Sequence, residues 1–190
     1  MLHDKNESVP EVSDPPPIDY FAVLGLPAVY ALDRDELERR YLERSREVHP
    51  DRFVGAEARQ RVEALGATME LNEAYKVLRD DTRRAEHLLA RRGLTIGGNE
   101  QLDPGMLMDV LEAREQLAEA QAQNDHATIA RLEEAMLDRR DGAIAEIAQS
   151  FESVERGDDD QLSRLHEIKR HLILLRYVDR YLEAADGDLD

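Results

Sequence analysis

His49, Pro50 and Asp51 form the segment whose residue types are best suited to chemistry or recognition. An imidazole donates or accepts a hydrogen bond near neutral pH, and a carboxylate binds an arginine through two parallel hydrogen bonds. The proline ring between them fixes φ and removes one backbone donor, so the loop loses less entropy when it docks. The triplet therefore fits an ordinary turn, half of a catalytic dyad, or a recognition point for another protein.

Other polar clusters do not complete a catalytic or metal site. His166 and His171 are five positions apart, about 140° around a helix, whereas a zinc-binding helix pairs histidines at i and i+4. Glu112, Glu115 and Glu119 share one helical face, but no facing segment supplies the Glu-x-x-His pair of a di-metal bundle. No nucleophile, base and charge stabiliser occur together. We therefore expect a protein that is not an enzyme and that binds no cofactor or metal.

The composition is that of an acidic, helix-rich protein. The 190 residues include 42 Asp and Glu against 25 Lys and Arg, a formal net charge of −17. This charge argues against nucleic acid or an anionic membrane as a partner, since both attract Lys and Arg. The absence of cysteine excludes disulfides and cysteine-ligated metal centres. Because neither a transmembrane span nor a signal peptide is recognisable, we expect a cytoplasmic protein.

The first half of the chain is predicted to be a series of helices. Residues 1–17 are polar and end in prolines, so we expect a disordered tail. Asp19 caps a short helix, and Asp33, which has capping-box spacing to Glu36, begins a longer one. The longer helix should end just before His49, because the following proline disfavours helical geometry there.

Two further helices precede a glycine-rich segment. One is predicted at roughly residues 60–79, and a short one ends at Gly93. The side chains that repeat at helical spacing in the longer one are Val62, Leu65, Met69, Asn72, Tyr75 and Leu78. The glycine-rich segment 94–103 lacks periodicity and is the best candidate for a domain boundary.

Three long helical patterns follow, near residues 104–123, 126–156 and 160–185. Short turns separate them, which makes neighbouring helices antiparallel. No strand-like alternation of useful length occurs. We therefore expect an all-α fold in which a helical hairpin with flanking short helices, residues 18–93, is joined through the linker 94–103 to a three-helix bundle, residues 104–186.

The first helix of the bundle has more apolar residues than one buried stripe needs. At about 100° per residue, its core side is formed by Met106, Val110, Ala113 and Leu117. Leu107 lies at the edge of that side, whereas Met108 and Leu111 point outward among the three glutamates. An exposed apolar strip with a polar rim is typical of a partner site. Packing against the hairpin or within the bundle remains an equal alternative.

A second apolar pair, Ile173 and Tyr177, is predicted on the last helix. The two residues are i, i+4 neighbours and lie nearly opposite the core stripe of Leu165, Leu172 and Leu175. An isolated three-helix bundle has no need of them on that side. This pair is either exposed for a partner or packed against the hairpin or within the bundle.

The setting of the triplet resembles the J domain of DnaJ-type co-chaperones. The resemblance is carried by "DYFAVLGL" (19–26), "YLERSREVHPDRF" (41–53) and "LNEAYKVLRDDTRR" (71–84). In that family two long helices form an antiparallel finger. The loop with the His-Pro-Asp triplet docks on a DnaK-type chaperone and stimulates its ATP hydrolysis.

The whole order of motifs is similar to that of the HscB family of J-domain co-chaperones. "DYFAVLGLPAVYALD", "HPDRF", "RRAEHLLARRG" and "MLMDVLEAREQLAE" carry this likeness over residues 18 to about 185. It implies a co-chaperone that binds an IscU-like iron–sulfur cluster scaffold and delivers it to a dedicated HscA-like chaperone. We expect the chain to be a monomer.

The resemblance also implies two sets of contact residues. Those for the chaperone are His49, Pro50 and Asp51. We expect accessory contacts from three arginines chosen by position rather than by the resemblance, because two of them lie opposite the apolar stripe of the second helix and one follows the triplet: Arg39, Arg46 and Arg52. Those for the scaffold protein are Leu107, Met108, Leu111, Glu112, Glu115, Glu119 and Tyr177. Glutamates alternate with the arginines of the second helix, which weakens the electrostatic attraction to an acidic chaperone.

Two other hypotheses remain open. The chain is either a J-domain co-chaperone for a different client, or an acidic structural or regulatory helical protein whose triplet is an ordinary turn. The first predicts binding of a DnaK-type chaperone without a cluster scaffold. The second predicts no effect on any ATPase.

Overall fold

The computed structural model describes residues 18–98, 100–158 and 160–186, and its regular elements are all helical. The first group of helices comprises α1 (Tyr20–Leu24), α2 (Arg34–Val48), α3 (Ala58–Arg79) and α4 (Asp81–Arg91), with a short 3₁₀ helix at Pro50–Phe53. The second comprises α5 (Pro104–Ala122), α6 (His126–Arg156) and α7 (Gln161–Asp186). The expected all-α fold is confirmed. The tail predicted for residues 1–17 lies outside the described residues.

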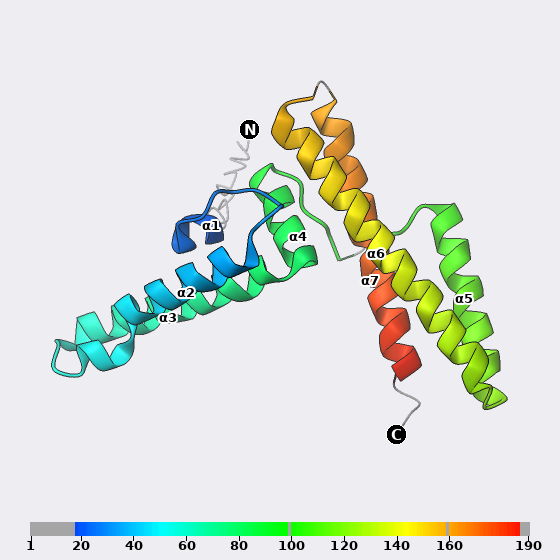
Figure 1. Ribbon diagram of the computed structural model, residues 1–190, viewed down its shortest axis with the longest axis horizontal. Coiled ribbons are helices and arrows are strands. Elements are labelled where there is room, and N and C mark those ends of the chain that lie inside the picture. Colours follow the sequence, from blue (N-terminus) through cyan, green and yellow to red (C-terminus); the bar gives the residue numbers. More distant parts are fainter. Residues whose placement is uncertain (1–17, 99, 159, 187–190) are drawn as a thin grey trace, which may run out of the picture.

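Helices α2 and α3 form a long antiparallel finger that projects away from the second group (Figure 1). Leu37 of α2 and Leu71 of α3 are buried where the helices meet. Tyr41 stacks on Tyr75 with a centroid distance of 4.2 Å, and its hydroxyl donates to Asn72 at 2.9 Å. Aromatic and hydrogen-bonded contacts therefore fix the register of the two helices.

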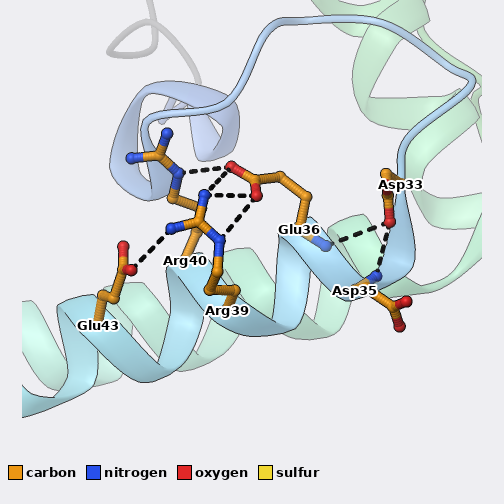
Figure 2. Close-up of polar contacts among 6 residues, drawn as sticks. All are labelled: Asp33, Asp35, Glu36, Arg39, Arg40 and Glu43. Atoms are coloured by element: carbon orange, nitrogen blue, oxygen red, sulfur yellow. Dashed lines mark hydrogen bonds and ion pairs between the residues drawn. The ribbon is translucent and has the colours of Figure 1, made fainter.

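The start of α2 follows the expected cap only in part. Asp33 accepts hydrogen bonds from the backbone N–H groups of Asp35 and Glu36, at 2.9 and 3.2 Å. Glu36 does not turn back to the cap, as the capping-box spacing suggested. Its carboxylate binds Arg39 and Arg40 instead (Figure 2). An ion pair with two guanidiniums replaces the weaker bond to one backbone N–H.

Helix α3 begins at Ala58, two residues before the predicted start. Its helically spaced residues Val62, Leu65 and Met69 do not form the buried face, since they are 70%, 54% and 66% exposed. The residues of α3 that are buried are Ala64, Leu71, Ala74, Val77 and Leu78. Helical spacing identified the helix correctly but not the side of it that α1 and α2 cover.

Helices α5, α6 and α7 form the predicted antiparallel three-helix arrangement (Figure 1). Asp103 caps α5 by accepting from Gly105 and Met106, and Pro104 occupies the first turn, where no N–H is needed. The buried side chains of α6 include Leu132, Met136, Ala143, Ile147 and Phe151. These side chains recur at the helical period along one face of α6, and Ile129 near its start is half-buried.

The structure decides between the two alternatives for Ile173 of α7. The helical projection placed it nearly opposite the core, either exposed or packed, and it is only 7% exposed. It lines a small cavity together with Leu102 and Met106, from the segment that leads into α5 and from α5 itself. Tyr177 is half-buried and packs against the hydrophobic core. The chain before α5 thus covers a face of α7 that an isolated bundle would leave open.

The two groups of helices pack directly against each other through Tyr30, in the loop before α2. Its ring stacks on Phe151 of α6 at 5.0 Å, and its backbone N–H donates to Glu155 at 2.9 Å. The buried Arg84 of α4 donates to the Tyr30 carbonyl at 2.9 Å. Burial, followed by the nearby charge of Asp81, raises the pKa of Tyr30 to about 12. These contacts connect the loop before α2 to both α4 and α6.

Among the described helices, none has the length and apolar character required to cross a membrane.

Candidate functional site

The His-Pro-Asp triplet lies at the end of α2, where the finger turns. His49 is extended, with φ −59° and ψ 128°, and Pro50 opens the 3₁₀ helix that follows. The hydroxyl of Thr68 in α3 donates a hydrogen bond to the Val48 carbonyl at 3.1 Å. The last turn of α2 is thereby attached to α3. A proline and a bond across the finger together restrict the conformations of the loop.

His49 and Asp51 present their polar atoms to solvent. The backbone N–H of Asp51 donates to Nδ1 of His49 at 3.3 Å, and Oδ2 of Asp51 lies 3.6 Å from the same nitrogen. Their side chains are 54% and 85% exposed. The Asp51 carboxylate is therefore open to a cationic group of a partner. An exposed His–Asp pair without a positioned nucleophile is suited to recognition rather than to catalysis.

The three predicted accessory arginines differ in their availability. Arg39 is held by Glu36 at 2.9 Å and by Glu43 at 2.8 Å (Figure 2). Hydrogen bonds from Arg39, and then from Arg40, lower the pKa of Glu36. The ion pair therefore persists at pH values below the usual pKa range of a glutamate. Arg39 must break these bonds before it can contact another protein.

Arg46 and Arg52 lie beside the loop without such partners. Within residues 18–98, neither guanidinium is found in an ion pair, although Arg52 donates to the Arg46 carbonyl at 3.1 Å. Both side chains are exposed. Contact of all three arginines with a chaperone stays a prediction, but the geometry favours Arg46 and Arg52 over Arg39.

The outward face of α5 carries the second set of predicted contact residues. Met108 and Leu111 are 66% and 46% exposed, whereas Leu107 is half-buried and packs on the core. The exposed glutamates beside them are Glu112, Glu115 and Glu119. We call these six residues the α5 surface. Their exposure follows the order that the helical projection predicts, and their role in binding stays a prediction.

The carboxylates of the α5 surface are not neutralised locally. Glu112 accepts from Gln116 at 3.4 Å and Glu119 from Gln123 at 3.1 Å, both neutral donors. In the described part of the chain, none of the three glutamates has a cationic partner, whereas Asp109 at the border of this surface pairs with Arg139 at 3.1 Å. Tyr177, predicted to join this site, is half-buried on α7. The α5 surface is therefore apolar with an uncompensated negative rim.

A further set of exposed apolar side chains on the finger was not singled out by the sequence as a possible site. It comprises Leu42, Val54, Val62, Leu65 and Met69, which are between 47% and 73% exposed. Leu42 lies off the buried stripe of α2. This departure from the 3.6-residue period was the signal from which its exposure could have been predicted. On α3 there was no such signal, because the exposed residues follow the helical period themselves.

Comparisons with known proteins match both halves of the chain. The DnaJ domain family matches residues 19–87, and the family described as HSCB C-terminal oligomerisation domain matches residues 102–186. The Co-chaperone protein HscB of Proteus mirabilis is 36% identical over 110 residues. That alignment covers 57% of this chain and 64% of the relative's length.

Solved structures show the same fold. Chaperone HscB from Vibrio cholerae superposes with a TM-score of 0.74 at 24% identity, covering 90% of this chain and 96% of that one. Human co-chaperone protein HscB gives a TM-score of 0.77 at 24% identity, covering 91% and 83%.

Fold and matched domains together define a J-domain protein with an additional helical domain at its C-terminal side. The chain belongs to the HscB family. The resemblance identified from the sequence motifs is thus confirmed. The domain boundary at 94–103 follows the first matched region, overlaps the start of the second at residue 102, and remains a prediction.

Proposed function

We propose that this protein is a non-catalytic co-chaperone in iron–sulfur cluster assembly. In this proposal the α5 surface and Tyr177 bind the cluster scaffold protein. The His-Pro-Asp loop docks on a DnaK-type chaperone and stimulates its ATP hydrolysis. Delivery of the scaffold to the chaperone is then the outcome of holding both on one molecule.

The observation that carries the proposal is the exposure of two unrelated surfaces on two domains that pack against each other. Asp51 is 85% exposed at the turn of the finger, and Met108 is 66% exposed on α5. The fold requires neither the Asp51 nor the Met108 side chain at its exposed position. The stack of Tyr30 on Phe151 lies at the contact between the domains that carry them. Family membership supports the same two roles.

The loop acts in this proposal through its charge and its restricted conformation. Asp51 offers both carboxylate oxygens to an arginine of the chaperone, which is the geometry of a strong charge-assisted pair. His49 keeps the backbone of Asp51 in place through its Nδ1 acceptor. No proton is taken from a substrate by this chain, because hydrolysis takes place in the chaperone.

Steady-state ATP turnover of the cognate DnaK-type chaperone, together with scaffold binding, tests the proposal. Asp51→Ala should abolish stimulation while scaffold affinity is unchanged. Met108→Ala with Leu111→Ala should lower scaffold affinity about 30-fold, since each truncation removes about 1 kcal/mol of apolar contact, and should leave basal stimulation intact. Equal loss of both activities in either variant would contradict the two-site proposal.

The same experiment separates the alternative client. Stimulation that depends on Asp51, without measurable binding of a cluster scaffold, would assign the J-domain function to another client. No stimulation by the wild-type protein would refute the co-chaperone role itself. We also infer a cytoplasmic protein, as the sequence predicts. We infer that it is a monomer, because two copies that each carry a net charge of −17 repel one another. Sedimentation analysis tests the monomer against self-association through the C-terminal domain.

A further inference from the structure

A polar network joins the two groups of helices at a place that neither predicted contact surface uses. Arg176 of α7 donates to the Glu86 carboxylate of α4 at 2.9 Å and to the Gly97 carbonyl of the linker at 3.3 Å. The side chains of Arg176 and Glu86 are 36% and 34% exposed. One guanidinium thus connects α4, the linker and α7, and its ion pair is partly withdrawn from the screening solvent.

The linker is attached to α7 at a second point. Glu100 accepts a hydrogen bond from Lys169 of α7 at 2.8 Å and another from the backbone N–H of Gly97 at 3.0 Å. The hydrogen bond from Lys169, and then the one from Gly97, lower the pKa of Glu100. A glycine-rich linker without such bonds is a flexible chain. Here it crosses α7 as a bound segment on its way to α5 (Figure 1).

The Arg176 bridge lies well away from the aromatic stack on Phe151 of α6. The ion pair between Arg140 and Asp179, at 3.2 Å, gives the register of the antiparallel α6 and α7 and places Phe151 level with Ile168. Arg176 is eight positions further along α7, about 12 Å at the helical rise of 1.5 Å per residue. A single contact permits two domains to rotate about it, whereas two separated contacts oppose rotation.

Neither domain needs this network to complete its own core. The buried side chains around it are Ala85 and Leu89 of α4 and Leu175 and Val178 of α7. Partly exposed ion pairs contribute little to stability. They are directional, however, whereas apolar contact is not. The network is therefore suited to fixing the angle between the domains rather than to raising the free energy of unfolding.

We propose that Arg176 is a positioning residue that sets the angle between the finger and the α5 surface. By holding Glu86 of α4 and the linker, it keeps the His-Pro-Asp loop and the α5 surface in the one arrangement in which a bound scaffold reaches the chaperone. The effective concentration of the scaffold at the chaperone depends on that arrangement. This functional part of the inference rests on the proposed function, whereas the positioning itself does not.

The positioning is tested without any partner protein. Because the chain has no cysteine, cysteines introduced at the exposed positions Glu70 of α3 and Glu134 of α6 take two spin labels specifically. Double electron–electron resonance then gives the distribution of distances between the domains. In Arg176→Gln and in Glu86→Gln we expect a distribution about twofold broader than that of the labelled wild type, because relative motion is the default for weakly joined domains.

A double-mutant cycle shows whether the two residues act through each other. The double variant Arg176→Gln with Glu86→Gln should be no broader than either single variant, since both remove the same bridge. The charge swap Arg176→Glu with Glu86→Arg should narrow the distribution again, because it restores the ion pair with its signs exchanged. Recovery in the swap also shows that the single variants are not simply misfolded.

The matched control is the ion pair of Arg140 with Asp179. Its distance is 3.2 Å and its side chains are 37% and 45% exposed, similar to the Arg176 pair, but it joins α6 to α7 within one domain. Arg140→Gln should leave the distance distribution unchanged. A control as broad as Arg176→Gln would show that any lost ion pair loosens the chain, and the inference would be wrong.

The functional part is tested by a titration of chaperone ATP turnover with the full-length chain, in the presence and absence of the scaffold protein. In Glu86→Gln, stimulation without scaffold and the affinity for scaffold should equal those of the wild type, because α4 carries none of the predicted contacts. The additional turnover that the scaffold brings should fall about threefold, since a freely oriented scaffold has a lower effective concentration. The charge swap should recover it.

The outcomes separate this inference from the proposed function. If Glu86→Gln and Arg176→Gln give the distance distribution of the wild type, the positioning role is refuted and the proposed function stands. If the distribution broadens but the effect of the scaffold on turnover is unchanged, the angle does not govern delivery and the functional part is overturned. A wild type that neither stimulates turnover nor binds scaffold refutes the proposed function, and the distance measurement still decides the positioning role.

Discussion

The α5 surface and the apolar residues exposed on the finger (Leu42, Val54, Val62, Leu65 and Met69) differ in their charged surroundings. On α5, Glu112 and Glu119 receive hydrogen bonds only from neutral glutamines. On the finger, Arg39 and Arg44 are paired with neighbouring glutamates. An uncompensated acidic rim attracts a cationic partner from a distance, whereas a rim in which some arginines are paired and others are free has a weaker attraction for an acidic partner. The two surfaces should therefore select different partners and respond differently to salt.

The largest effect is expected from neutralising the rim of the α5 surface. Changing Glu112, Glu115 and Glu119 together to Gln should weaken scaffold binding about tenfold at low salt, because three exposed charge contacts of roughly 0.5 kcal/mol each sum to about 1.5 kcal/mol. It should also flatten the salt dependence of the affinity. Isothermal titration of the scaffold protein at several salt concentrations measures both.

A matched control for these glutamates lies on α6. Glu134, Asp138 and Glu146 are exposed as well, but they are outside the α5 surface. Changing them to Gln, Asn and Gln alters the net charge by the same amount. If this control weakens binding as much as the α5 variant, the overall charge of the chain rather than the rim determines the affinity, and the contrast between the two surfaces fails.

A smaller effect is expected from the arginines of the finger. Arg46→Ala should raise the half-maximal concentration for ATPase stimulation about threefold, whereas Arg39→Ala should change it less than about twofold. The reason is that Arg39 is already bound to Glu36 and Glu43, and Arg46 is not paired within residues 18–98. The measurement is the same turnover titration. An Arg39 effect equal to that of Arg46 would show that its ion pairs open on docking.

The smallest effect is expected on the pH dependence of stability, through His87 at the base of the finger. Its ring is buried against Tyr20, with a centroid distance of 4.7 Å, and its Nε2 atom lacks a hydrogen-bond partner among the described residues. Burial, and then the nearby charge of Arg91, lowers the pKa of His87, although Asp19 acts in the opposite direction. The unfolded chain consequently binds the proton more readily than the folded one.

Stability should therefore fall as the pH drops below the ordinary histidine pKa of about 6.5 and towards the lowered folded value. We expect the Tm of the wild type to decrease more between pH 7 and pH 5 than that of His87→Phe, measured by circular dichroism. Salt dependence of docking at neutral pH should be unchanged in this variant. Equal decreases in Tm would show that other groups dominate the acid sensitivity of the finger.

Local sequence signals predicted much of this architecture. Asp19, Asp33 and Asp103 cap the helices that they were expected to cap, because a short acceptor side chain satisfies free N–H groups within the next few residues. Pro50 ends α2 after Val48 for an equally local reason. The exposure of Met108 and Leu111 was also predictable, since the 3.6-residue period separates them from the buried Val110 and Leu117.

Contacts between distant segments were not predictable in this way. The helical projection left Ile173 either open to a partner or packed, and the segment before α5 covers it. Arg84 is buried because the carbonyls of Tyr30 and Leu78 accept its hydrogen bonds, and no local pattern pairs an arginine with a residue 54 positions away. The stack of Tyr30 on Phe151 likewise joins residues of different domains.

By itself the sequence determined the helices, their caps, the His-Pro-Asp loop that follows α2, and the family to which the chain belongs. These features depend on interactions within a few residues or on the order of motifs along the chain. Only the tertiary structure decided which apolar faces are covered, because burial depends on which helix arrives from elsewhere in the chain. It therefore exposed Val62, Leu65 and Met69, buried Ile173, and distinguished the paired Arg39 from the available Arg46.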